Sequence, residues 1–274
     1  MKIPQKLLDT LKKLSLDEKI YEERSRKCVL SKEYLGMEVV PWCENAYFIP
    51  EGLEKENNFV FDPVSLVPCL ALQPEKNDRI LDMCAAPGTK THILSFLTEN
   101  EADITANDID ARRIMRLRYN AKKFGIKCRI INESGRKIQG SYNKILVDVP
   151  CSGSGMVNKK EKLFRHWNSR RVKILAKKQK KLVEHAFEIL EKNGILVYST
   201  CTFQPEENEA VVNHLLDKFS DSRIEEMNVN VNHAKGITEW DDRRFKEEIQ
   251  KCIRIYPQHN KTGGFFVAKI RKRI

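Results

Sequence analysis

Long apolar segments are absent from this sequence. None of its 274 residues belongs to an apolar run of about 18, the length that a membrane-spanning helix needs. Residues 1–16 alternate Lys with Leu and do not place an apolar stretch after a charged one, as a secretory signal does. We therefore expect a cytoplasmic protein that makes no contact with a membrane.

Paired cysteines are also missing. The eight cysteines stand singly, without a Cys-x-x-Cys pair and without a close Cys/His cluster. This spacing argues against a zinc site, so we expect no bound metal. In a reducing compartment a lone cysteine is by default a small buried hydrophobic residue. That interpretation covers the cysteines without further context, which are Cys28, Cys43, Cys69, Cys128 and Cys252.

Acidic residues are scarce between positions 158 and 181. Eleven Lys or Arg stand there against one acid, Glu161, and this segment holds nearly the whole net charge of +11. Basic side chains neutralise phosphates and aromatic rings stack on bases, so the segment favours a nucleic acid. A solvated helix face is the alternative, because the apolar residues from Val172 to Ala186 form one helical stripe. The candidate RNA-binding residues are Lys159, Lys160, Lys162, Arg165, Trp167, Arg170 and Arg171.

The first sixty residues are expected to form a small, mainly helical appendage. A helical period over positions 7–14 predicts one helix. Ser15 with Glu18 resembles a capping box and predicts a second helix through about Leu30. Short strands are expected at 39–42 and 47–49.

A polar stretch at 54–58 predicts the boundary between two domains. The division is then an RNA-contacting appendage at 1–58 and a larger domain at 59–274. The appendage either selects the RNA or serves as a packing cap.

Short apolar runs alternate with amphipathic helical patterns after Asp62. Strands are predicted at 79–82, 103–107, 128–131, 144–148, 194–199 and 264–269, and helices at 89–99, 110–124, 170–192 and 206–218. This alternation predicts a doubly wound α/β sheet. Ligands of such sheets bind at the carboxyl ends of the strands.

The first of these strands leads into a loop of small residues, from Asp82 to Thr91. Small residues allow a close approach to a ligand, and the following helix offers free N–H groups. The loop lacks the Walker spacing and the Gly-x-Gly-x-x-Gly pattern, so neither a triphosphate nor a dinucleotide is indicated. At the end of the next strand, Asp108 is placed to accept the hydroxyls of a ribose.

Two cysteines follow strand ends at the same predicted edge. Cys151 comes after the strand 144–148, and Cys201 comes after the strand 194–199. A thiol in such a position can have a lowered pKa, and the thiolate is the nucleophilic form. Both are therefore candidates for covalent catalysis.

These motifs together resemble those of one enzyme family. The matching runs are Phe61-Asp62-Pro63-Val64-Ser65, Leu81 to Thr91, Asn107-Asp108-Ile109-Asp110, Asp148-Val149-Pro150-Cys151-Ser152-Gly153, Tyr198-Ser199-Thr200-Cys201-Thr202, Pro205-Glu206-Glu207-Asn208-Glu209 and Thr262-Gly263-Gly264-Phe265-Phe266. The sequence resembles the RNA (cytosine-5)-methyltransferases of the Sun and nucleolar-protein family, and among them the short archaeal transfer-RNA enzymes. The resemblance covers roughly residues 60 to 270.

The resemblance implies a Rossmann-like methyltransferase sheet that binds S-adenosylmethionine. Cys201 would be the nucleophile and Cys151 would help to release the product, with Asp148 and Lys90 as further catalytic residues. The implied cofactor-binding residues are Cys84, Ala85, Ala86, Pro87, Gly88, Thr89, Lys90, Asp108, Arg113 and Asp148. Where the family has an acid before Gly-Arg this chain has Ser134, preceded by Glu133, so the residue at the adenine stays open.

The implied chemistry explains why these groups are needed. C5 of cytosine is a poor nucleophile until a thiolate attacks C6. Asp148, if protonated, could hydrogen-bond N3, and Cys151 or a nearby water would remove the C5 proton. The base must also leave its stack to reach the thiolate.

Several alternatives remain open at this point. Cys151 could be the nucleophile, as in DNA cytosine-5 enzymes, or the Asp148 motif could serve an exocyclic amine. The chain could also be a non-catalytic RNA-binding protein that retains the fold. We expect a monomer that acts on tRNA, with rRNA as the alternative substrate.

Overall fold

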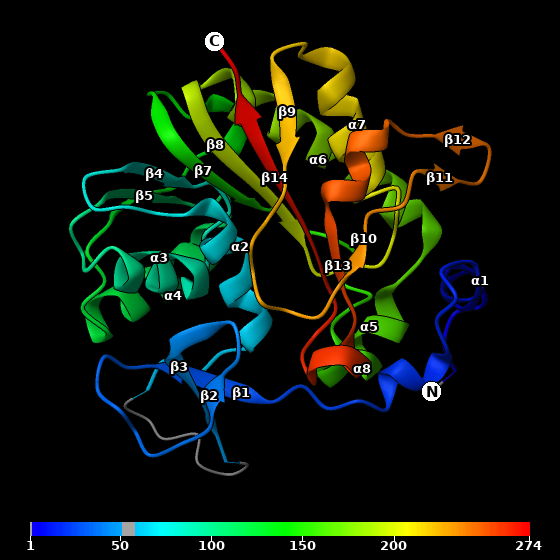
Figure 1. Ribbon diagram of the computed structural model, residues 1–274, viewed down its shortest axis with the longest axis horizontal. Helices are drawn as coiled ribbons and strands as arrows, with labels where there is room; N and C mark the ends of the chain where they lie inside the picture. Colours follow the sequence, from blue (N-terminus) through cyan, green and yellow to red (C-terminus); the bar gives the residue numbers. More distant parts are fainter. Residues whose placement is uncertain (1, 51–57) are drawn as a thin grey trace.

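A mixed β-sheet forms the centre of the structure (Figure 1), a computed structural model that describes residues 2–50 and 58–274, with the backbone alone for Lys162. Its strand order is β10-β13-β14-β8-β7-β4-β5-β6, and β9 pairs with β14. The parallel strands are β4 (Arg79–Asp82), β5 (Asp103–Asn107), β6 (Arg129–Ile131), β7 (Tyr142–Asp148) and β8 (Leu190–Thr200). The antiparallel strands are β9 (Ser222–Glu225), β10 (Ala234–Lys235), β13 (Ile253–Ile255) and β14 (Phe265–Lys272).

Alternation along the strands divides the core into two layers. Ile80 and Leu146 belong to one apolar cluster, while their neighbours Leu81 and Val147 belong to another. This follows from the period of two in a strand, which sends successive side chains to opposite faces. Both faces are therefore covered by helices, as expected for a doubly wound sheet.

The helices cover these two faces. On the face of Ile80 lie α2 (Leu66–Leu72), α3 (Thr89–Leu97) and α4 (Ala111–Lys123), and on the other lie α6 (Ser169–Glu188) and α7 (Glu209–Lys218). The short helices α5 (Lys160–His166) and α8 (Pro257–Asn260) and the hairpin of β11 (Glu239–Trp240) and β12 (Arg243–Arg244) lie outside these layers. Within 2–50 and 58–274, no helix has both the length and the apolar character to cross a membrane.

The predicted α/β organisation is confirmed. Each of the six strands and four helices expected after Asp62 is present, with bounds that differ by a few residues. The short elements α2, α5 and β9 to β13 were not predicted. A pattern of so few residues does not distinguish a helix or strand from a loop.

The N-terminal region contains a helix and a small antiparallel sheet (Figure 1). Its elements are α1 (Gln5–Lys13), β1 (Lys27–Leu30), β2 (Val39–Val40) and β3 (Cys43–Ile49), with strand order β1-β3-β2. The first helix and the short strands are confirmed, but the second helix from Ser15 to about Leu30 is wrong. Ser15 has a φ of 56°, and only one 3₁₀ turn forms after it, at Glu18–Tyr21. Pairing of β1 with β3 outweighs the local capping signal.

The N-terminal region shares its core with the rest of the chain. Leu7 and Leu11 of α1 pack in one cluster with Trp167 and Phe203, and β3 joins the cluster that contains α2. The division at 1–58 and 59–274 therefore stays a prediction. Of the polar stretch expected at the boundary, positions 54–57 lie outside the described residues.

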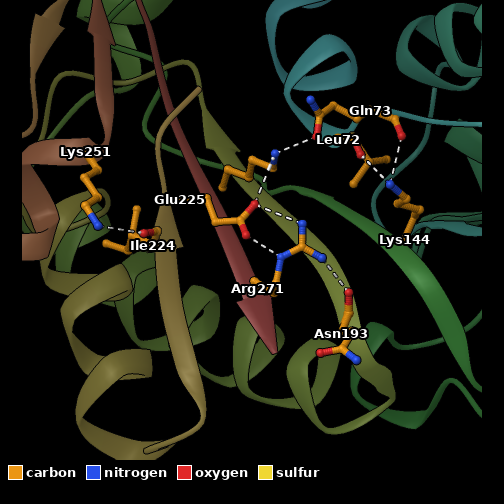
Figure 2. Close-up of polar contacts among 9 residues, drawn as sticks. Leu72, Gln73, Lys144, Asn193, Ile224, Glu225, Lys251 and Arg271 are labelled. Carbon is orange, nitrogen blue, oxygen red and sulfur yellow. Dashed lines mark hydrogen bonds and ion pairs between the residues drawn. The ribbon is translucent and has the colours of Figure 1, made fainter. Parts of the chain in front are cut away.

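The end of the sheet where the parallel strands begin is held by polar contacts (Figure 2). Lys144 Nζ donates to the carbonyls of Leu72 (3.3 Å) and Gln73 (2.8 Å), which end α2. Arg271 of β14 pairs with Glu225 of β9 and donates to the carbonyl of Asn193 at 2.7 Å. These contacts join α2 to β7, and join β14 to β9 and β8, at this end of the sheet.

Candidate functional site

The loop after β4 turns sharply at the carboxyl end of the sheet. Ala85 N donates to the carbonyl of Asn107 at 2.7 Å, which ties the loop to the end of β5. Gly88 precedes α3 with a φ of 108°, and a Cβ there would lie 2.8 Å from Leu117 Cδ1. Only glycine meets both demands without strain.

A cavity of about 580 Å³ opens beside this loop. Its wall combines the loop, the end of β5, the turn after β6 and α6, with the lining residues Met83, Cys84, Asn107, Asp108, Ile109, Arg113, Ser134, Gly135, Arg136, Pro150, Leu175, Lys177, Lys178, Gln179, Lys181 and Leu182. The size falls within the range of about 300–1,000 Å³ for small-molecule sites. We call it the larger cavity.

Three residues of the predicted cofactor set line the larger cavity. They are Cys84, Asp108 and Arg113. The segment 85–89 continues the same loop without lining this cavity, whereas Lys90 and Asp148 line a different cavity. The predicted set thus divides between two neighbouring sites.

Asp108 is held in place by the start of α4. Its side chain is 2% exposed, and Oδ2 lies 2.8 Å from Nη1 of Arg113. Its other oxygen accepts the N–H of Asp110 at 2.9 Å. Arg113 also donates to the carbonyl of Ala86. A fixed, charge-paired carboxylate therefore stands at the cavity wall.

The turn after β6 resolves which of two neighbouring residues faces the larger cavity. Ser134 is among the lining residues and Glu133 is not. The side chain of Asn107 accepts the N–H of Glu133 (2.9 Å) and donates to its carbonyl (3.1 Å). This clamp fixes the backbone of the turn and leaves Glu133 exposed.

Cys151 and Cys201 meet at the ends of β7 and β8. Their Sγ atoms are 3.2 Å apart. Contact with Cys201, followed by burial, raises the pKa of the Cys151 thiol. Cys151 therefore keeps its proton and can donate it toward the sulfur of Cys201.

Hydrogen bonds between the two turns hold the cysteines together. Thr202 Oγ1 contacts the hydroxyls of Ser152 and Ser154, each at 2.8 Å. Gly155 N donates to the carbonyl of Cys201 at 2.9 Å. A Cβ on Gly155 would collide with the carbonyl of Gly264, so this close approach requires glycine.

A second cavity, of about 230 Å³, is lined by three of the four catalytic candidates and is named here the smaller cavity. Lys90, Asp148 and Cys201 line it, while Cys151 does not. The other lining residues are Ser25, Lys27, Asp62, Val64, Ser65, Gly155, Met156, Val157, Asn158, Lys159, Gly263, Gly264 and Phe265. A thiol and an ion pair thus share one concave site.

Lys90 and Asp148 form this ion pair. Lys90 Nζ lies 2.7 Å from Asp148 Oδ2, and Ser199 Oγ donates to Oδ1 at 2.8 Å. Burial lowers the pKa of Lys90, but Asp148 together with the other nearby acidic groups raises it by more, so the lysine stays charged. Lys90 and Asp148 thus form one polar unit in the smaller cavity, and the hydrogen bond from a protonated Asp148 to N3 stays a prediction.

The N-terminal region supplies part of the smaller cavity, which the sequence did not reveal. Asp62 accepts the N–H of Gly263 at 3.0 Å and the hydroxyl of Ser25, joining this region to the turn before β14. The family-like run around Asp62 was the one sign in the sequence that this residue has a function, but no role was predicted for it. Its position at the smaller cavity follows from its contact with Gly263, which is 201 residues away in the chain.

Glu207 was also missed as a functional residue. Its buried carboxylate accepts Ser152 N (3.0 Å) and Gln179 Nε2 (2.8 Å), so it supports the turn that carries Cys151. Burial raises the pKa of Glu207 to about 7. The sequence showed the motif 205–209 that contains Glu207. It did not show that this carboxylate lies against the turn that carries Cys151.

Asp82 lies beneath the loop with one oxygen unsatisfied. Thr91 Oγ1 donates to Oδ2 at 2.8 Å, and Oδ1 has no partner among the described residues. Burial raises the pKa of Asp82 to about 7. A buried polar atom without a partner is costly, so this oxygen is available to a ligand or water.

The predicted RNA-binding residues differ in their surroundings. Lys159 lines the smaller cavity, and Lys160 donates to the carbonyl of Tyr21 at 2.8 Å. Arg165, Arg170 and Arg171 are exposed, and the side chain of Lys162 lies outside the described residues.

Trp167 is a correction to the predicted RNA-binding set. Its ring is 7% exposed and packs with Leu7 and Leu11 of α1. It fills the core between α1 and α6 and is not open to stack on a base. Its place in a basic segment had suggested a surface position.

The remaining cysteines behave as small core residues. Cys28, Cys43, Cys69 and Cys252 are buried and Cys128 is partly buried, all as free thiols. Across positions 2–50 and 58–274, the structure contains no group of three or more His, Cys, Asp or Glu arranged to hold a metal ion.

The matching family and two related proteins are all described as RNA methyltransferases. The family described as 16S rRNA methyltransferase RsmB/F matches residues 69–271. A tRNA (cytosine(49)-C(5))-methyltransferase of Pyrococcus abyssi is 34% identical over 257 residues, covering 89% of this chain and 82% of that protein. Ribosomal RNA small subunit methyltransferase F of Vibrio parahaemolyticus is 36% identical over 251 residues. The alignment covers 85% of this chain but spans about half, 51%, of that relative.

Solved structures agree with this result. A methyltransferase homolog protein from Pyrococcus horikoshii has a TM-score of 0.81 and 28% identity, covering 98% of this chain and all of that one. NSun6 from the same organism, in a crystal structure with SFG, has a TM-score of 0.71 and 29% identity. The comparison covers 84% of this chain and 60% of that chain.

Proposed function

The chain belongs to the family of 16S rRNA methyltransferase RsmB/F, and on this premise we propose that it methylates C5 of cytosine in RNA through a covalent Cys201 adduct. Its relatives are named as RNA methyltransferases, and the sheet is of the Rossmann-like methyltransferase type. S-adenosylmethionine is the methyl donor of this family. One observation carries the assignment of the nucleophile: Cys201 lines the smaller cavity together with Lys90 and Asp148.

The larger cavity suits S-adenosylmethionine. Asp108 offers a fixed carboxylate for ribose hydroxyls, and the neighbouring Asp82 has an unsatisfied oxygen under the loop. Ser134 is placed to meet the adenine in the role that the sequence left open between it and Glu133. When bound, the cofactor supplies an electrophilic methyl group.

The two cysteines take unequal roles in this proposal. Cys201 faces the cavity and, after its proton has passed to water, attacks C6 of the cytosine as the thiolate, which raises the electron density at C5. Cys151 lies behind it at 3.2 Å and keeps its proton, so it can return a proton to the Cys201 sulfur when the adduct breaks. The C5 proton is removed by a water beside Cys151, or by Cys151 itself as its own proton passes to the departing Cys201 sulfur, a step of the kind worth about 10²- to 10⁴-fold.

Lys90 and Asp148 orient the base. Asp148 accepts from Lys90 and Ser199, and its carboxylate can also accept from the exocyclic amine of a cytosine in the cavity. The ammonium of Lys90 can donate to the ring carbonyl or to N3, where charge grows after thiolate attack. The ion pair thus supplies both a donor and an acceptor for one base edge.

We propose tRNA as the substrate. The relative from Pyrococcus abyssi carries a tRNA name and is matched over most of its length, whereas the Vibrio rRNA relatives are about twice as long. The N-terminal region, whose Ser25 and Lys27 line the smaller cavity, is placed to influence which cytosine enters. A monomeric, metal-free, cytoplasmic enzyme stays a prediction.

The test is methyl transfer followed by mapping. Unmodified tRNA and small-subunit rRNA are incubated with the protein and S-adenosylmethionine, and bisulfite sequencing then locates protected cytosines. We expect protection at a defined tRNA position and none in rRNA. Protection confined to rRNA would reverse the substrate, and no protection in either RNA would refute the function.

A further inference from the structure

The exposed face of α4 carries a second basic surface, outside the segment 158–181. Residues 111–132 contain eight Lys or Arg and no Asp or Glu. Four of these side chains are exposed on α4 and form no ion pair with any residue that the structure describes; they are Arg112, Arg116, Arg118 and Lys122. Their positive charge is therefore uncompensated.

Two large apolar side chains lie within this basic face. Met115 is 71% exposed and Tyr119, one turn later, is 64% exposed. The helical period places Arg112 and Arg116 on one side of this pair and Arg118 with Lys122 on the other. A ring framed by cations suits a nucleic acid strand, since the cations neutralise phosphates and the ring stacks on a base.

The arrangement is unfavourable for an isolated helix. Arg112 and Arg116, like Arg118 and Lys122, are like charges four residues apart, and such pairs destabilise a helix. No acid within α4 offsets them. A polyanion bound to this face would remove the repulsion.

The start of α4 belongs to the wall of the larger cavity. Ile109 and Arg113, at the start of α4, line the larger cavity, and Lys177, Lys178 and Lys181 of α6 line the same cavity. Basic residues from two different helices thus border the cofactor site.

We propose that the exposed face of α4 binds the sugar-phosphate backbone of the RNA substrate, with Tyr119 stacking on an unpaired base. This inference rests on the proposed function, because it takes the partner to be the RNA that is methylated. The RNA would then be held on both sides of the larger cavity, by α4 and by the segment 158–181.

The test compares two triple variants that lose the same charge. Arg116→Gln/Arg118→Gln/Lys122→Gln alters α4, and Lys192→Gln/Lys235→Gln/Arg273→Gln removes exposed charges elsewhere. Binding of transcribed tRNA is measured by fluorescence anisotropy over a range of salt concentrations. We expect the α4 variant to bind about tenfold more weakly near 0.1 M salt, and its slope of log affinity against log salt to fall by about 2. The control should change less than about twofold, and both should bind S-adenosylmethionine like the wild type.

Tyr119 gives an independent readout of stacking. We expect Tyr119→Ala to weaken tRNA binding about fivefold and Tyr119→Phe to retain it, because a phenyl ring still stacks. Tyr119→Phe thus serves as the matched control at the same exposed position. Equal effects of Tyr119→Ala and Tyr119→Phe would argue against a stacking site on α4.

The outcomes separate this inference from the proposed function. If the wild type methylates RNA and the α4 triple variant binds tRNA as its control does, the inference is wrong and the function stands. If the wild type methylates no RNA, the function fails, and the anisotropy result still decides whether α4 binds tRNA. If the α4 variant loses binding to polyglutamate and not to tRNA, the face suits an acidic protein and the inference is wrong.

Discussion

The sulfur atoms of Cys151 and Cys201 lie 3.2 Å apart, although 50 residues separate them in the chain. Of these two cysteines, Cys201 lines the smaller cavity and Cys151 does not. Hydrogen bonds between the turns after β7 and β8 maintain this contact. The geometry therefore gives two chemically identical side chains different access to the smaller cavity.

Exchange of each cysteine for alanine should separate their roles. We expect Cys201→Ala to lose more than about 10⁴-fold in rate and to form no trapped complex with RNA that contains 5-fluorocytosine. Cys151→Ala should still form the complex and release it slowly, because Cys151 lies behind the attacking sulfur. Denaturing gels detect the complex, and Cys252→Ala, at a buried distant thiol, is the control. A complex with Cys201→Ala but not with Cys151→Ala would reverse the assignment.

Asp108 should govern affinity for S-adenosylmethionine. Asp108→Ala removes a carboxylate that lines the larger cavity and leaves Arg113 unpaired, so we expect the cofactor Kd to rise about 10- to 100-fold. Asp103→Ala, at the exposed start of the same strand, is the control and should leave Kd unchanged. Calorimetry measures both. A Kd unaffected by Asp108→Ala would place the cofactor elsewhere.

Glu207 should make the protein less stable as the pH rises toward 7. Burial raises the pKa of Glu207 to about 7 in the folded protein, whereas an unfolded glutamate titrates near about 4.3. Its stabilising contribution is complete below the unfolded pKa and is lost as the pH rises through the folded one, by up to about 1.4 kcal/mol per pH unit.

The substitution Glu207→Gln tests this effect. Urea unfolding at pH 5.5 and 7.5 should show a smaller loss of stability in Glu207→Gln than in the wild type. Part of the loss of stability between the two pH values should remain in Glu207→Gln, because burial also raises the pKa of Asp82 to about 7. The exposed Asp242→Asn is the control, and an equal loss in all three proteins would contradict the prediction.

The buried pair of Arg254 and Glu209 should be important for stability. Two contacts of 2.6 Å join side chains that are 2% and 0% exposed. Arg254→Met would leave the carboxylate buried without its partner, and we expect a loss of about 3–5 kcal/mol.

An exposed pair provides the comparison. Arg244 and Glu239 are 88% and 67% exposed, so Arg244→Met should cost less than about 1 kcal/mol. The double variant Arg254→Met/Glu209→Gln should recover part of the stability, because no unpaired charge remains. Urea unfolding measures all three, and equal losses for Arg254→Met and Arg244→Met would refute the role of the buried pair.

The sequence by itself determined the order of six strands and four helices after Asp62. Periods of 2 and 3.6 depend on residues a few positions apart, so they are readable without a structure. The same patterns placed Asp108, Cys151 and Cys201 at strand ends, and parallel strands bring their carboxyl ends to one edge. The sequence therefore predicted the fold class and the edge that holds the candidate site.

The tertiary structure alone decided how that edge is divided. Packing between distant segments brings Cys151 into contact with Cys201 and places Ser134 at the wall of the larger cavity. So does the burial of Trp167 against α1, which no local pattern reports. The predicted helix after Ser15 failed for the same reason, since long-range strand pairing outweighed a local capping signal. Local propensity selects the elements, and the free energy of packing them together selects which side chains share a cavity.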